Sequence, residues 1–299
     1  MDLIREPFQY EFFRHGLLAA TMIGALCGLM GVYIVLRRMS YIGHGLSHSV
    51  FGGAVVSFLM GWNFYLGAGL WGFLSAVLIN RAARRHAIGA DAAIGIVTTA
   101  SFALGVALIS KTRSFTRDFE AALFGNILGV TTQDLLVIAA VGLVVGAAVL
   151  GAYKQLLFAT FDPGLASIYG VPTQWVETGF ALALAATIVA SLNVVGATLI
   201  AAAIVIPPTT ARLLTDSFGR MLAISTALGA LCGALGMLGS YWFDVASGAS
   251  IVLLSTAVFC AVLAATSLRQ AANRRRAAPT PIAFPARDHA ADRAAQPGD

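Results

Sequence analysis

The stretch from His15 to Leu36, HGLLAATMIGALCGLMGVYIVL, contains no Asp, Glu, Lys or Arg. It is long enough to cross the hydrocarbon core of a bilayer, which takes about 20 residues of helix. The rest of the chain repeats this pattern. Of the 299 residues 58% are apolar and 11% are charged, against about 25% charged in soluble domains. The sequence therefore predicts an all-α, polytopic bundle of transmembrane helices.

Uncharged runs bounded by charges or turn-forming residues mark the expected spans. They cover residues 14–36, 46–60, 64–80, 92–110, 133–152, 174–192, 195–212, 221–243 and 248–268. Two longer runs are divided at Gly61-Trp62-Asn63 and at Asn193, because these residues favour turns. Nine spans result. Eight spans is an alternative, because the run 46–60 is short for a crossing.

The basic residues indicate the orientation. An N-terminus outside and a C-terminus inside place 14 of the 19 Lys and Arg on the inner side, as the positive-inside rule requires. The net charge of +5 is dispersed between apolar runs instead of forming a patch, which argues against nucleic acid as a partner. The three cysteines lie far apart in apolar runs and indicate packing, not a disulfide or thiolate site.

Composition divides the chain into an N-terminal segment, 1–13, a membrane domain, 14–268, and a tail, 269–299. The tail is rich in Ala, Pro, Arg and Asp, so it is predicted to be disordered because it buries too little apolar surface to offset chain entropy. Within the membrane domain, small residues at helical spacing predict close approach of helix backbones. Two such sets are Gly24, Gly28 and Gly31, and Gly229, Gly233 and Gly236.

Two histidines four residues apart are the most informative feature for chemistry. His44 and His48 lie in RRMSYIGHGLSHSVFGG, residues 37–53, and a helix would place them on one face. Neutral imidazoles bind zinc, manganese or iron, and the same pair from a symmetric second copy could complete a four-nitrogen shell. Histidines that only make hydrogen bonds within the bundle are the alternative. Gly45 stands where a zinc peptidase needs Glu, so that motif is absent.

A second unusual segment is KQLLFATFDPGLASIYGVPTQWV, residues 154–176. It predicts a short surface helix with Asp162 as N-cap, Pro163 at its start and Gly170 at its stop. On the predicted inner side, such a helix could dock a cytoplasmic partner. The alternative is an interfacial helix that only caps the bundle.

A third segment is NVVGATLIAAAIVIPPTTARLL, residues 193–214. Pro207 and Pro208 remove backbone hydrogen bonds, so the helix is expected to kink or end there. Thr209 and Thr210 are expected to bond to the freed carbonyls. A broken helix lining a pathway and a plain helix terminus before Arg212 both fit this pattern.

Several catalytic motifs are absent from the sequence. Neither Lys111 nor Lys154 follows the glycines of a phosphate-binding loop, so the chain has no ATP site of that kind. The nucleophile elbow is missing, and Ser250 has no histidine in its own segment, which disfavours an intramembrane protease. No carboxylate falls in the middle of a span, which argues against a proton-driven carrier. We expect a transport subunit, not an enzyme, with its energy source in another protein.

At these segments the sequence resembles the metal-ion permeases of ATP-binding cassette importers, the zinc, manganese and iron uptake family. The resemblance runs from about Phe12 to Arg269. It rests on Arg38-Met39-Ser40-Tyr41 with Ser47-His48, on Leu123-Phe124-Gly125-Asn126-Ile127-Leu128-Gly129, on Asp162 to Gly170, on Val195-Gly196-Ala197 with Ile206-Pro207, on Thr210 to Leu214, and on Ser247-Gly248-Ala249.

The resemblance implies a multi-pass protein of the cell membrane that acts as a homodimer, with two cytoplasmic ATPase subunits and an extracytoplasmic solute-binding protein that delivers the metal. No cofactor is bound permanently, and the partner uses the ATP. The implied roles are metal contact for His44 and His48, ATPase coupling for Asp162, Pro163, Leu165, Ala166 and Gly170, and pathway or kink positions at Gly196, Pro207 and Pro208.

The sequence departs from the family at one implied ligand. Family members usually carry Asp where this chain has His44, and the loss of an anionic oxygen shifts the expected preference from manganese toward zinc. Two alternatives stay open, an ion-coupled carrier that acts alone and a permease for a siderophore or vitamin.

Overall fold

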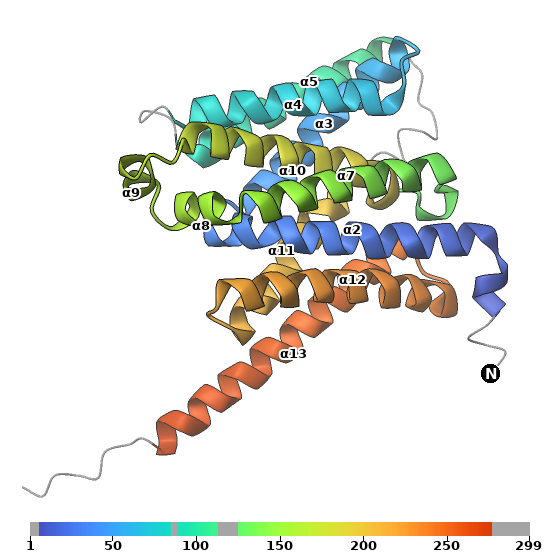
Figure 1. The fold of residues 1–299 in the computed structure, drawn as a ribbon. Coiled ribbons are helices and arrows are strands. Elements are labelled where there is room, and N and C mark those ends of the chain that lie inside the picture. The colour runs from blue at the N-terminus through green and yellow to red at the C-terminus, as the bar shows by residue number, and fades with distance from the viewer. Residues whose placement is uncertain (1–5, 85–88, 113–124, 277–299) are drawn as a thin grey trace, which may run out of the picture. The chain divides into compact units, whose positions relative to one another are not determined.

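The computed structural model describes residues 6–84, 89–112 and 125–276. Helices account for nearly all of these residues, and no strand occurs among them (Figure 1). The elements are η1 (Glu6–Gln9), α2 (Glu11–Leu36), α3 (Tyr41–Leu59), α4 (Phe64–Ala83), α5 (Ala90–Thr112), η2 (Ile127–Gly129), α7 (Thr132–Gly151), α8 (Tyr153–Phe161), α9 (Pro163–Ile168), α10 (Thr173–Val195), α11 (Ala197–Leu214), α12 (Phe218–Phe243) and α13 (Ser247–Arg276).

The polytopic helical bundle is confirmed, and the described residues contain eight helices long enough to span a membrane. The helices that are long and apolar enough to cross a membrane are α2, α3, α4, α5, α7, α10, α12 and α13. The expected ninth span, 195–212, corresponds to α11, which has 18 residues. At 1.5 Å per residue its length is about 27 Å, slightly short of a hydrocarbon core of about 30 Å.

Helix α11 begins inside the bundle. Its first residue, Ala197, and the preceding Val195 are almost fully buried. The expected break at Asn193 is wrong by three residues, because Asn193 is still helical and the turn forms at Gly196. Gly196 has φ 82° and ψ 157°, a conformation that is essentially restricted to glycine. The other expected break is confirmed, since Asn63 caps the start of α4 by accepting a hydrogen bond from the Tyr65 amide.

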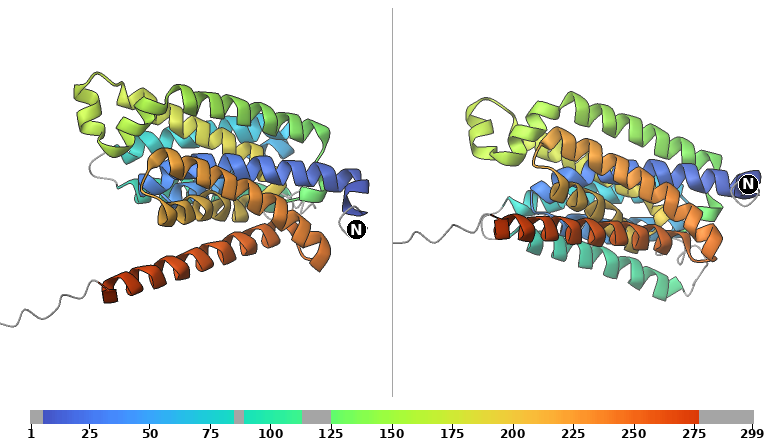
Figure 2. Two further views of the ribbon diagram at one scale, coloured as in Figure 1. Left: turned by 60° about the horizontal axis from the view of Figure 1, so that its bottom comes forward. Right: turned by 90° about the horizontal axis from the view of Figure 1, so that it is seen from below.

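The predicted close contact of glycines forms between α2 and α12, which lie side by side (Figure 2). A Cβ built on Gly24 would lie 2.1 Å from the Gly229 carbonyl oxygen, and one built on Gly229 would lie 2.0 Å from the Gly24 carbonyl oxygen. Further along, the Ser225 hydroxyl donates to the Gly28 carbonyl at 2.6 Å. The two backbones therefore touch directly, and the contact needs glycine on both helices.

The last helix is longer than expected. The span 248–268 is part of α13, which continues to Arg276, so the first eight residues of the expected tail are helical. Ala, Gln and Arg in this stretch favour a helix. The chain divides into one compact unit through Leu263 and a second unit from Ala264. The remainder of the tail, 277–299, and the motif residues Leu123 and Phe124 lie outside the described residues.

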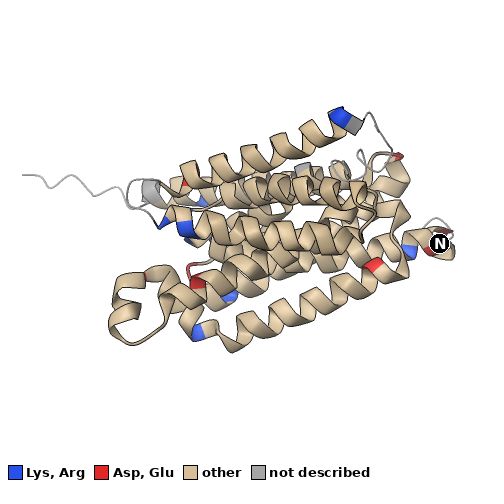
Figure 3. Ribbon diagram, turned by 90° about the horizontal axis from the view of Figure 1, so that it is seen from above, with Lys and Arg blue, Asp and Glu red and all other residues tan. Residues whose placement is uncertain are grey.

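Charged residues lie near the ends of the helices, and the middles of the helices are almost free of them (Figure 3). Arg37 and Arg84 directly follow α2 and α4, Lys154 lies in the first turn of α8, and Arg212 lies in the last turn of α11. A bilayer requires charged residues to lie at the helix ends and not in the middles. Their placement therefore agrees with a multi-pass membrane protein. The inside–outside orientation stays a prediction.

Candidate functional site

The segment with the two histidines is helical, and the histidines lie on one face. Helix α3 begins at Tyr41, five residues before the expected start of the span. The ring centroids of His44 and His48 are 4.5 Å apart and the rings meet edge to face. Both residues are half-buried, so part of each side chain remains accessible from outside this chain.

Aromatic rings extend this pair in both directions. Tyr41 packs on His44 with ring centroids 5.4 Å apart, and Phe102 of α5 packs on His48 at the same distance. Across the described ranges, no group of three or more His, Cys, Asp or Glu residues is placed to hold a metal ion. Within the described residues, the pair would therefore offer two imidazole ligands to a metal ion.

Ser47 ties the histidine segment to the start of α11. Its hydroxyl lies 2.9 Å from the His44 carbonyl and 3.0 Å from the Ala197 carbonyl, and the side chain is fully buried. Ala197 directly follows Gly196. The structure thus joins the predicted metal residues and the predicted pathway residue Gly196 through one hydroxyl group.

The two prolines do not end α11, which continues to Leu214. Both prolines are buried, and their role in a pathway stays a prediction. The expected bonds from the threonines to the freed carbonyls do not form, because the threonines bond to carbonyls two residues further on. Thr209 and Thr210 donate to the carbonyls of residues 205 and 206, whereas the prolines deprive those of residues 203 and 204, because helical bonds run from i to i−4.

The segment 154–176 forms two short helices, α8 and α9, instead of one. Asp162 is the N-cap of α9, as predicted, with Oδ1 accepting a hydrogen bond of 2.8 Å from the Leu165 amide. Pro163 occupies the first turn, and Gly170 follows the helix with φ 79°. Ala166 is fully buried and faces the bundle. The coupling role of these residues stays a prediction.

The outward face of α9 is apolar. Leu165, Ile168 and Tyr169 are 43%, 80% and 73% exposed. The last two were missed as site residues by sequence reasoning, although their spacing three and four residues from Leu165 is the signal that would have indicated one helical face. Phe161, just before the N-cap, adds a further apolar ring that is 63% exposed.

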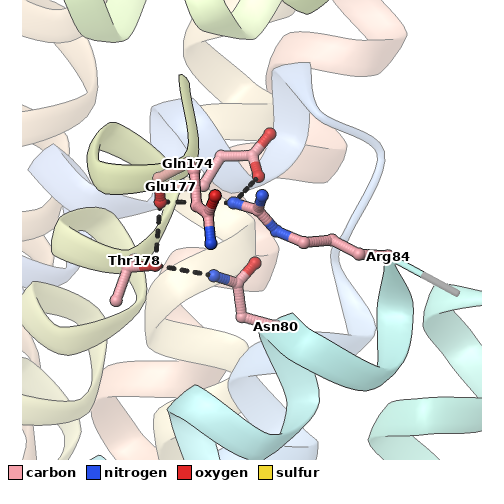
Figure 4. Close-up of polar contacts among 5 residues, drawn as sticks. All are labelled: Asn80, Arg84, Gln174, Glu177 and Thr178. Carbon is pink, nitrogen blue, oxygen red and sulfur yellow. Dashed lines mark hydrogen bonds and ion pairs between the residues drawn. The ribbon is translucent and has the colours of Figure 1, made fainter. Parts of the chain in front are cut away.

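Polar contacts join the ends of α2, α4, α8 and α10 beside this segment. The Nε of Arg37 donates to the Thr160 hydroxyl of α8 at 3.1 Å, and its guanidinium lies 4.7 Å from the centroid of the Phe180 ring. Arg84 pairs with Glu177 of α10 at 2.7 Å (Figure 4). Sequence reasoning used these arginines only to assign topology, because charge position alone does not reveal a partner some 90 or more residues away.

The comparisons with known proteins agree with this fold. A family model described as the ABC 3 transport family matches residues 9–266. The chain is 38% identical over 250 residues to the "Manganese transport system membrane protein MntC" of Halalkalibacterium halodurans, covering 84% of this chain and 86% of that protein. It is 34% identical to the "Chelated iron transport system membrane protein YfeC" of Yersinia pestis, covering 87% and 88%.

A solved structure is also similar to this chain. "PsaBC from Streptococcus pneumoniae in complex with Fab" matches with a TM-score of 0.79 and 34% identity, covering 87% of this chain and 94% of that chain. The fold and the matches define a multi-pass membrane subunit of the ATP-binding cassette transporter class. The chain belongs to the ABC 3 transport family, which confirms the resemblance seen in the sequence.

Proposed function

We propose that this chain is the permease subunit of an importer for divalent transition metal ions, zinc, manganese or iron. The observation that carries the proposal is the half-buried His44–His48 pair, with ring centroids 4.5 Å apart. Relatives named for manganese and iron transport support the same substrate class. Because imidazole is a borderline ligand and no carboxylate of the described residues forms a metal-binding group with the pair, zinc is the favoured ion.

The proposed working unit is a homodimer with two cytoplasmic ATPase subunits and an extracytoplasmic solute-binding protein. A second copy of the chain would bring a second histidine pair, so that four nitrogens could surround one ion. Such a shell has to be transient, because a transport site must release its ion as well as bind it.

The proposed docking surface for the ATPase is the apolar face of α9, formed by Leu165, Ile168 and Tyr169, which are exposed. Nucleotide binding would bring the ATPase subunits together and move α8 and α9. The Arg37–Thr160 hydrogen bond would pass that motion to the end of α2 and the start of α3, which carries the histidines. The pathway would then alternate between outward and inward access.

Reconstituted vesicles containing the permease and its ATPase test the assignment of the histidines. His44→Ala and His48→Ala should each reduce zinc uptake and zinc-stimulated ATP hydrolysis by at least tenfold, because each removes half of the ligands in this chain. His15→Ala is the matched control, since His15 lies near the N-terminus, where its Nε2 is 3.9 Å from Oε1 of Glu11. Unchanged uptake in both α3 variants would contradict the metal assignment.

The same vesicles separate this function from its alternatives. Uptake by the chain without an ATPase would establish an ion-coupled carrier. Uptake of a chelated metal or a vitamin, with no response to free metal ion, would establish the siderophore or vitamin alternative.

A further inference from the structure

A cavity of about 320 Å³ lies between the ends of α4 and α10 and the short helices α8 and α9. Most of its wall is apolar, with Met39, Ile42, Ile79 and Phe180 among the lining residues. Its polar lining includes Arg37, Arg84 and Glu177. Apolar walls with a few charged groups at one place are typical of a site for an amphiphilic ligand.

The charges around this cavity do not balance. Arg84 is neutralised by Glu177, with 2.7 Å between Nη2 and Oε2, and it also donates to the Gln174 carbonyl at 3.2 Å (Figure 4). Among the described residues, no carboxylate lies within ion-pair distance of Arg37. Its Nε donates to Thr160, and its Nη2 is buried and has no hydrogen-bond partner in the part of the chain that the structure describes. One positive charge is therefore left over.

Burying a guanidinium that has no paired carboxylate costs free energy. Burial lowers the pKa of Arg37 from its ordinary value, with Glu177 and Tyr33 acting in the opposite direction. The Phe180 ring under the guanidinium offsets part of the desolvation, but it accepts no hydrogen bond in the plane of the group. Nη2 itself is covered, but Arg37 lines the cavity. A phosphate oxygen there would meet the guanidinium from the cavity side, and guanidinium and phosphate form short, charge-assisted hydrogen bonds.

We propose that this cavity binds an anionic phospholipid, with its phosphate at Arg37 and the start of its acyl chains against the apolar wall. The ligand is a lipid and not free phosphate because inorganic phosphate has no apolar part to cover the wall. The position also fits, since Arg37 and Arg84 follow the last residues of membrane-spanning helices, where lipid headgroups lie. Basic pockets between helices at this level recognise anionic headgroups elsewhere.

The full-length chain, purified in a mild detergent, provides the test. Native mass spectrometry would measure retention of phosphatidylglycerol against phosphatidylcholine of the same acyl chains. Phosphatidylglycerol should be retained at least tenfold better. Arg37→Gln should lower the retention of phosphatidylglycerol about tenfold, because a hydrogen bond to a charged group is lost. Arg38→Gln is the matched control, since Arg38 is adjacent and exposed, and it should retain the lipid as the unmodified chain does.

A second variant keeps the charge and tests the apolar wall. Ala181 lines the cavity and is buried, so Ala181→Leu should fill part of the space and lower retention of phosphatidylglycerol by at least threefold with Arg37 intact. Equal retention of the two lipids, or equal behaviour of the Arg37 and Arg38 variants, would overturn the proposal. Inorganic phosphate would be measured in the same way, and retention equal to that of phosphatidylglycerol would overturn the assignment to a lipid.

Discussion

Replacing Gly24 by alanine should force α2 and α12 apart. The added Cβ would lie 2.1 Å from the Gly229 carbonyl oxygen and 2.7 Å from its carbonyl carbon. An unstrained contact between carbon and a carbonyl oxygen is about 3.3 Å, so the backbones must separate by about 1.2 Å. Because both atoms belong to the backbone, no side-chain rotation relieves the overlap.

The cost follows from two opposing effects. Overpacking a close contact costs about 1–3 kcal/mol, and alanine regains about 1 kcal/mol over glycine through helix propensity. A net destabilisation of up to about 2 kcal/mol is expected, towards the upper end because both overlapping atoms are backbone atoms. Gly229→Ala meets the same contact from the other side, at 2.0 Å from the Gly24 carbonyl oxygen. The double variant should therefore cost less than the sum of the two single variants, since one separation relieves both overlaps.

Thermal unfolding in a single detergent measures this effect. The buried thiols of Cys27 and Cys232 become reactive toward a fluorogenic maleimide when the bundle opens. Gly146→Ala is the matched control, because a Cβ at Gly146 in α7 meets nothing within 4 Å, so that variant should be as stable as the unmodified chain or slightly more so. Equal unfolding temperatures for the Gly24 and Gly146 variants would refute the close-contact reasoning.

Three further substitutions test other parts of the structure. Asp162→Ala removes the N-cap of α9 and should cost about 1 kcal/mol of local stability, seen as faster amide exchange at Leu165, whereas Asp162→Asn should keep the cap. Arg84→Gln should lower the free energy of unfolding by less than about 1 kcal/mol, since the pair with Glu177 is partly exposed, and adding Glu177→Gln should cost little more. Gly196→Ala should cost about 1–3 kcal/mol by melting temperature, because φ 82° with ψ 157° strains any residue with a Cβ, and a weaker effect than that of Gly95→Ala would contradict this.

The helical spans were predictable because the bilayer imposes one simple rule on the sequence. Uncharged stretches had to be helical, so eight of the nine expected spans appear with their ends shifted by a few residues. The exception, α11, is helical as expected, but it begins at Ala197 inside the bundle and is short for a crossing. Its buried start accepts a hydrogen bond from Ser47 at the Ala197 carbonyl, and residues 150 positions apart leave no local signal of their pairing.

The site was predictable only where the information is local. The spacing of His44 and His48 and the cap formed by Asp162 follow from helix geometry, and both are observed. The contacts of Arg37 with Thr160 and Phe180 could not be anticipated in this way. They depend on where α8 and α10 meet the end of α2, which is decided by tertiary packing and not by the residues next to Arg37.

Pro208 of α11 and Gly31 of α2 are far apart in the sequence, but they meet in the structure at one carbonyl group. Pro208 has no N–H to donate to the carbonyl of Ile204, four residues earlier. That carbonyl points at Gly31, where a built Cβ would lie 1.9 Å from its oxygen. A glycine is thus required opposite the missing hydrogen bond, and its Cα–H can approach the carbonyl as a weak donor. At Pro208, therefore, α11 continues with its unbonded Ile204 carbonyl packed against the backbone of α2 at Gly31.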